Sequence, residues 1–110
     1  MTRAEIKCLD DNIYYEARGE SELGMLLVAK TTINRARNSD ICKVVYQKNQ
    51  FSWTSYPRSK PDPKIYKQIE QLDVYSIKSN AMYFHNTKVH PKWAKYKVVI
   101  AKEGNHIFYD

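Results

Sequence analysis

The segment from Asn12 to Glu20, NIYYEARGE, contains the residues best suited to acid–base chemistry. Glu16 falls near the end of an expected helix, where the negative end of the helix dipole disfavours an ionised carboxylate. The preceding tyrosines and the like charge of Glu20 raise the pKa of a carboxyl group, whereas Arg18 lowers it. A carboxylic acid that keeps its proton near neutral pH can donate it to a glycosidic oxygen. The alternative interpretation is a helix that ends in solvated charges.

A second cluster, residues 50–54, combines aromatic rings with hydroxyl and amide groups. Aromatic faces can cover the C–H bonds of a sugar ring, while polar groups hydrogen-bond to its hydroxyls and acetamides. This composition makes Gln50, Ser52 and Trp53 candidates for sugar binding. Packing in a hydrophobic core would explain the aromatic members, Phe51 above all, equally well.

A third cluster of histidines and aromatic residues lies near the C-terminus, around residues 83–85 and 105–109 and at Trp93. Alternate residues of a strand share a face, so Tyr83 and His85 should point together, away from Phe84. By the same rule His106 shares a face with Phe108 and lies opposite Ile107 and Tyr109. One face can belong to the core and the other to a cleft wall, and each histidine can be structural or functional.

Several other chemistries have no sequence signature here. The chain contains no Ser-His-Asp order, nucleophile elbow, Gly-rich phosphate loop or HEXXH motif. Cys8 and Cys42 form no CxxC and have no nearby pair of histidines, so we expect neither a metal site nor a cofactor. The two cysteines either form a disulfide or pack as small buried hydrophobes.

Helices are expected in the first part of the chain and strands in the last third. Thr2 with Glu5 three residues later is a capping box, and Gly19 favours a helix end. The expected helices cover residues 2–19, 21–37 and 40–45, and a fourth runs from Asp62-Pro63 to Leu72. Residues 50–54 should be extended or irregular, and Pro57, Pro61 and Pro63 mark a surface loop. Strands are expected at 81–85, 97–101 and 106–109. Helices first and strands last predict one α+β domain over residues 1–110, with a small antiparallel sheet. The second helix has the most continuous apolar face, so we expect it at the centre of the core.

The chain is basic, with 18 Lys and Arg against 12 Asp and Glu among 110 residues. A net charge of +6 favours polyanions, and both nucleic acid and an anionic cell wall fit. The charged N-terminus lacks the apolar region of a signal peptide, and no apolar run reaches about 20 residues. We therefore expect a soluble protein made in the cytoplasm, with no stable membrane insertion. We also expect a monomer.

Six segments in this order, NIYYEARGES, GMLLVAKTTINRAR, ICKVVYQ, QFSW, AMYFHN and GNHIFYD, resemble the SleB-type cell-wall hydrolases. This family includes spore-cortex-lytic enzymes and phage lysins, and the resemblance extends from about Cys8 to Asp110. It implies a mostly helical, lysozyme- or lytic-transglycosylase-like fold and cleavage of the glycan strand of peptidoglycan. It also implies that Glu16, the first Glu of EARGE, is the catalytic glutamate. The substrate-binding candidates are Glu20, Gln50, Ser52, Trp53, Tyr83, His85, Asn105 and His106.

The expected mechanism uses one carboxylate. Glu16 protonates the oxygen that leaves C1 of N-acetylmuramic acid and then acts as base, either toward the sugar's own C6 hydroxyl or toward water. Relatives often carry an export signal or a wall-binding domain, which this chain lacks, so we expect a phage or prophage lysin that is released by the phage lysis machinery or carried in the virion.

Two rival functions remain at this stage. A non-catalytic glycan-binding module would keep the aromatic residues but would not need Glu16. A small nucleic-acid binder would fit the positive charge and the nine tyrosines, since bases stack on aromatic rings. The basic residues are scattered rather than gathered in one stripe, and we therefore expect no nucleic-acid partner.

Overall fold

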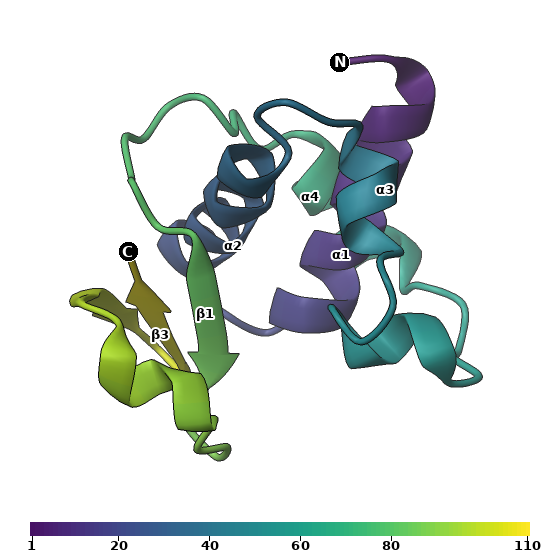
Figure 1. The fold of residues 1–110 in the computed structure, drawn as a ribbon. Helices are drawn as coiled ribbons and strands as arrows, with labels where there is room; N and C mark the ends of the chain where they lie inside the picture. Colours follow the sequence, from purple (N-terminus) through teal and green to yellow (C-terminus); the bar gives the residue numbers. More distant parts are fainter.

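The computed structural model describes all residues 1–110 and contains four α-helices, two 3₁₀ helices and three strands. The helices form one side of the molecule and the sheet lies at the other (Figure 1). This arrangement confirms the expected α+β class with a small C-terminal antiparallel sheet.

The first helix, α1 (Arg3–Ala17), begins at the predicted capping box. The Thr2 hydroxyl accepts from the Glu5 N–H at 3.1 Å, and the Glu5 carboxylate accepts from the Thr2 N–H at 3.0 Å. Gly19 follows the helix with φ +88°, a backbone conformation that residues with a Cβ rarely adopt. Ile6 is 44% exposed, because the first turns of α1 lie at the edge of the helical group (Figure 1).

The second helix, α2 (Glu22–Arg35), is capped by Ser21, whose hydroxyl accepts from the Gly24 N–H at 3.0 Å. A short helix, α3 (Ile41–Val45), starts at the predicted cap Asp40. Cys8 of α1 and Cys42 of α3 form a disulfide with a sequence separation of 34. A loop of that size restricts the unfolded chain and stabilises the fold by about 3–4 kcal/mol.

Residues 50–54 were expected to be extended or irregular, but most of them belong to a short helix. The 3₁₀ helix η1 (Ser52–Ser55) forms there, because the backbone N–H and hydroxyl of Thr54 both donate to the Phe51 carbonyl, at 3.2 and 2.8 Å. The last α-helix, α4 (Pro63–Glu70), begins where predicted, with Asp62 as cap and Pro63 at its first position.

The sheet contains β1 (Tyr83–Asn86), β2 (Val99–Glu103) and β3 (His106–Tyr109) in the antiparallel order β1-β3-β2, so β1 is an edge strand. Two strands start later than predicted. The Ala81 carbonyl accepts from the Asn34 amide of α2 at 2.9 Å, and Lys97 ends the 3₁₀ helix η2 (Lys92–Tyr96) by donating to the Ala94 carbonyl at 3.2 Å.

Two helices, rather than α2 alone, form the centre of the core. α1 contacts α2, α3 and α4, whereas α2 contacts α1, α3 and β1. Ile13 of α1 and Val28 of α2 are both 0% exposed. Phe108 packs against them from the sheet as part of the same cluster. None of the helices has the length and apolar character needed to cross a membrane.

Candidate active site

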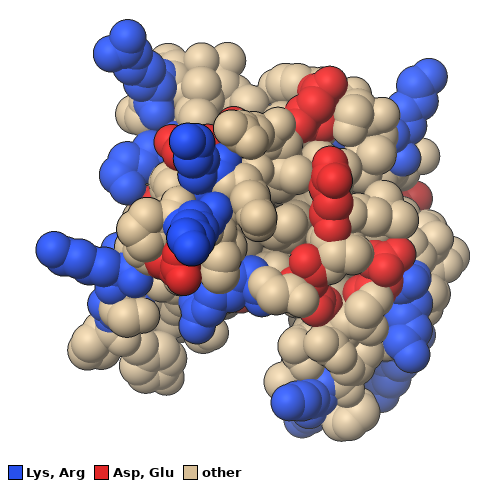
Figure 2. Space-filling model, turned by 180° about the vertical axis from the view of Figure 1, so that it is seen from behind, with Lys and Arg blue, Asp and Glu red and all other residues tan.

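A groove of about 640 Å³ lies between the C-terminal end of α1, the η1 segment and β1. From behind, a notch opens between two lobes at the lower edge of the molecule (Figure 2). A second hollow of about 480 Å³ shares walls with the groove and continues along β1 toward Tyr83 and Trp93.

Glu16 lies in the last turn of α1 and lines this groove. Its carboxyl group forms no hydrogen bond or ion pair with the rest of the chain. Burial raises the pKa of Glu16 from an ordinary 4.5 to about 7. A carboxyl group with a pKa in this range can hold a proton near neutral pH, which suits a general acid.

The charged neighbours of Glu16 in the sequence do not control this pKa. Arg18 is exposed, and its guanidinium lies 5.1 Å from the ring centre of Tyr14. The Glu20 carboxylate is bound elsewhere, at the sheet. Burial is the cause of the shift, and burial could not be deduced from the order of residues in the motif.

Tyr15 forms one wall of the groove and is supported from behind by Trp53. The two rings are stacked with their centres 4.9 Å apart, and the Tyr15 hydroxyl donates to the Ser59 carbonyl at 2.6 Å. Trp53 is 8% exposed and its indole N–H donates to Asn12 Oδ1 at 2.7 Å. Asn12 in turn donates to the Thr32 hydroxyl of α2 at 3.2 Å. Trp53 was predicted to bind sugar, but it does not line the groove.

Gln50 and Ser52 line the groove from the η1 side. Arg35 of α2 connects this side to the sheet: it donates to Gln50 Oε1 at 2.7 Å and to the Met82 carbonyl at 3.2 Å. Its guanidinium also lies 5.4 Å from the ring centre of Tyr83. Arg35, which sequence reasoning missed, therefore sets the distance between the two walls.

His85 lines the groove from β1 with both ring nitrogens engaged. Because Nδ1 lies 2.8 Å from the Asn86 carbonyl, it donates there, and Nε2 can accept from the Tyr109 hydroxyl at 2.7 Å. The ring stacks on Tyr109 with centres 5.3 Å apart. Trp93 lies against both Tyr83 and His85, whereas Phe84 contacts Phe51 and Phe108 of the core. Because Phe84 also lines the groove, the predicted separation of faces holds only in part.

Glu20 lies outside the groove and holds the β2–β3 turn. Its carboxylate accepts from the backbone N–H and the amide of Asn105 at 2.8 and 3.3 Å, and it pairs with His106 Nδ1 at 3.0 Å. The side chains of Glu20 and His106 are 10% and 5% exposed. We call these three residues, Glu20, Asn105 and His106, the hairpin clamp. Glu20 and Asn105 were predicted to bind substrate, but of the clamp only His106 lines the groove.

The structure thus brings five of the nine predicted site residues into the groove, namely Glu16, Gln50, Ser52, His85 and His106. Tyr83 lines the adjoining hollow. Sequence reasoning missed the groove residues Tyr15, Asn49, Ser55, Tyr56, Asn86 and Val89, and did not expect Phe84 to reach the groove. Most of these lie within one or two residues of the predicted clusters, whereas no pattern in the sequence marks Val89.

The groove can supply one protonatable carboxyl group among aromatic and hydroxyl walls. It contains no second Asp or Glu. No three or more His, Cys, Asp and Glu side chains come together in a way that could hold a metal ion.

The family model for cell wall hydrolases matches residues 19–109, a span that begins just after Glu16. No curated protein sequence matches the chain significantly. The catalytic domain of the germination-specific lytic transglycosylase SleB from Bacillus anthracis has a TM-score of 0.78 and 25% identity, over 100% of this chain and 97% of that one. The SleB catalytic domain from Bacillus cereus has a TM-score of 0.76 and 24% identity, over 99% and 91%. Because the family model covers most of the chain and the fold agrees from end to end, this protein is an enzyme that belongs to the SleB-type cell wall hydrolase family.

Proposed function

We propose that this enzyme cleaves the glycan strand of peptidoglycan as a lytic transglycosylase, with Glu16 as general acid and then general base. The observation that carries the proposal is an unpaired carboxyl group in a groove, with its pKa raised by burial to about 7. Membership of the cell wall hydrolase family supports peptidoglycan as the substrate. Similarity to a lytic transglycosylase of Bacillus anthracis supports transglycosylation as the reaction.

In the first step, the Glu16 carboxyl group donates its proton to the glycosidic oxygen that leaves C1 of N-acetylmuramic acid. The C1–O bond breaks, and positive charge develops on C1 and the ring oxygen of the sugar. The new Glu16 carboxylate lies close to this charge and stabilises it. Tyr15 and Phe84 line the same groove as Glu16 and contribute apolar surface to it.

In the second step, the Glu16 carboxylate takes the proton from the C6 hydroxyl of the same sugar. The C6 oxygen attacks C1 and closes a 1,6-anhydro ring, so Glu16 regains its proton and no water is consumed. Glycosidases that hydrolyse their substrate commonly use two carboxylates about 5–9.5 Å apart. Because the groove has no second carboxylate, the internal nucleophile fits it better than an activated water.

A digestion of purified peptidoglycan in ¹⁸O-labelled water tests both the catalytic residue and the product. Mass spectrometry should find glycan ends that are lighter by one water and free of ¹⁸O. The Glu16→Gln variant should release none of them, while Glu22→Gln, which alters an exposed carboxylate on α2, should act like the wild type. Hydrated ends that contain ¹⁸O would instead indicate a muramidase, and unchanged cleavage by Glu16→Gln would remove the proposal.

The monomeric state of the enzyme stays a sequence-based prediction. Its origin as a phage or prophage lysin and its route to the wall stay sequence-based predictions.

A further inference from the structure

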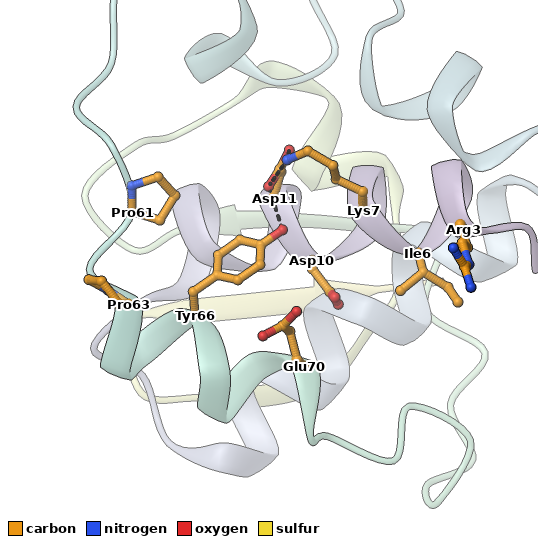
Figure 3. A pocket seen from close by; sticks show the side chains of 9 residues that line it. All are labelled: Arg3, Ile6, Lys7, Asp10, Asp11, Pro61, Pro63, Tyr66 and Glu70. Carbon is orange, nitrogen blue, oxygen red and sulfur yellow. Dashed lines mark hydrogen bonds and ion pairs between the residues drawn. The ribbon is translucent and has the colours of Figure 1, made fainter.

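A pocket of about 610 Å³ lies between α1 and α4, and none of its residues lines the catalytic groove. We call it the Asp10 pocket. Figure 3 shows acidic side chains on opposite sides of it, with Asp10 on α1 and Glu70 on α4 pointing toward one another. Tyr66, Pro61 and Pro63 line the same pocket with ring surface.

Asp10 is a buried carboxylate without a partner. It is 7% exposed, and it forms no hydrogen bond or ion pair although it lines the pocket. Asp11, the next residue, differs in this respect. It pairs with Lys7 at 3.1 Å and accepts from the Tyr66 hydroxyl at 2.7 Å.

The electrostatics of the pocket favour a positive charge between Asp10 and Glu70. Burial, together with the negative charges of Glu70 and Asp11, raises the pKa of Asp10 to about 6, and Lys7 opposes this only in part. A carboxylate that is unpaired and close to other negative charges is stabilised when a cation binds beside it. Neither Asp10 nor Glu70 forms an ion pair within the chain.

The shape and walls of the pocket distinguish among cations. A bare metal ion would need several convergent ligands, and no group of three or more acidic, His or Cys side chains meets that need. The volume also exceeds that of a single ion by far. The Tyr66 ring already lies 6.0 Å from the Lys7 ammonium, and such an aromatic surface suits an organic cation with an alkyl chain.

We propose that the Asp10 pocket binds a primary alkylammonium group, with Asp10 and Glu70 as its ionic partners and Tyr66 against the alkyl chain. Peptidoglycan supplies this group on the diamino acid side chains of its peptides. Naming the wall peptide as the source rests on the proposed function of the enzyme, whereas the binding chemistry does not. The pocket would then hold the peptide part of the wall while the groove holds the glycan.

A titration with Nα-acetyl-lysine amide, followed by NMR of the backbone amides, tests the binding chemistry. The signals of residues 10, 66 and 70 should shift in a saturable way. Nα-acetyl-norleucine amide has nearly the same alkyl chain without the ammonium group and should bind at least about tenfold more weakly. Equal binding of the two compounds, or no saturable shift at these residues, would overturn the proposal.

Two variants identify the ionic partners. Asp10→Asn and Glu70→Gln should each weaken lysine-amide binding about tenfold, since each removes one of the two unpaired charges. Glu70 is exposed, so its replacement leaves the fold intact even if Asp10→Asn affects folding. Glu22→Gln is a matched control with the same loss of charge outside the pocket and should bind normally. If Glu70→Gln binds as tightly as this control, the pocket does not bind the ammonium group as proposed.

Acetylation of the free amines in purified walls tests the source of the ammonium group. The KM of the wild-type enzyme should rise about tenfold on acetylated walls, with kcat unchanged. An unaltered KM would exclude the wall peptide, and pentane-1,5-diamine binding would then point to a free diamine. Glu16→Gln should still bind lysine amide. The binding experiment therefore tests the pocket independently of the proposed catalytic role of Glu16.

Discussion

Two glutamates of one short motif, Glu16 and Glu20, lie in opposite environments. Glu16 ends in the groove without a partner, and burial raises its pKa to about 7. Glu20 is held by Asn105 and His106 in the hairpin clamp, where its carboxylate accepts from two donors of Asn105 and pairs with His106. The positive φ of Gly19 turns the chain between them, so the two side chains diverge.

This comparison separates an acid available for chemistry from an acid used for structure. The Glu20 carboxylate is occupied by its contacts with Asn105 and His106 and does not line the groove. An unpaired and buried carboxyl group keeps its proton at higher pH. The clamp nevertheless serves the groove, because its third member, His106, is one of the groove's walls.

The largest difference should appear in catalysis. Glu16→Gln should lower the rate of wall lysis at least about 1,000-fold, because glutamine can neither donate nor accept the transferred proton. The same change should stabilise the fold by about 1–2 kcal/mol at pH 7, since a buried carboxyl with a raised pKa opposes folding when it ionises. Turbidity of purified walls and denaturant unfolding measure the two effects. Near wild-type lysis by Glu16→Gln would show that Glu16, like Glu20, is not the catalytic acid.

The pH profile should identify Glu16 as the acid. Its pKa is raised to about 7, so kcat/KM should fall about tenfold per pH unit above that value, as the proton is lost. Because the folded pKa exceeds the ordinary 4.5, the stabilising contribution of Glu16 is full below pH 4.5 and is lost as the pH rises through about 7. Initial rates on soluble glycan fragments test the profile, and a flat rate between about pH 7 and about pH 9 would contradict it.

A change in the clamp should affect stability more than chemistry. Glu20→Gln removes the charge from three polar contacts and should cost about 2 kcal/mol of unfolding free energy. The lytic rate of the folded protein should stay within about threefold of the wild type, because Glu20 does not touch the groove. The exposed Glu22→Gln serves as control in both assays. A loss of activity as large as that of Glu16→Gln would assign Glu20 a catalytic role.

The smallest expected difference in unfolding free energy is between alanine substitutions at two glycines with positive φ. At Gly104 (φ +56°) a Cβ would lie 2.9 Å from Glu20 Oε1, whereas at Gly19 (φ +88°) it would meet no atom within 4 Å. Gly19→Ala should cost about 1 kcal/mol through backbone strain alone, and Gly104→Ala about 2 kcal/mol. In a Glu20→Ala background the difference should disappear, as a double-mutant cycle of unfolding free energies can show. If the difference persists in the Glu20→Ala background, the cost of Gly104→Ala does not come from a clash with Glu20.

Local signals predicted where helices begin more reliably than where strands begin. The caps at Thr2, Asp40 and Asp62 act on backbone N–H groups two or three residues away, so the sequence alone contains both partners. The strand starting at Tyr83 was predicted too early, because Asn34 of a distant helix holds Ala81 out of the ladder. A contact between distant segments produces no pattern of residue types that sequence analysis could detect.

The candidate site shows the same division. Glu16 and the third cluster were found from residue types, and the alternation of Tyr83 and His85 follows from strand geometry. Trp53 was assigned to the groove because its type suits sugars. Its true position depends on Asn12, a residue of another element, which accepts its indole N–H.

The sequence by itself determined the helix caps, the shared face of Tyr83 and His85 and the acidic motif, because each depends on residues a few positions apart. Only the tertiary structure decided that Glu16 is partly buried without a partner and that Glu20 binds a turn 85 residues later. It also decided that Asp10 and Glu70, from different helices, face one pocket. The pKa of a carboxyl group depends on its burial and its neighbours, and both are set by contacts between segments far apart in the chain.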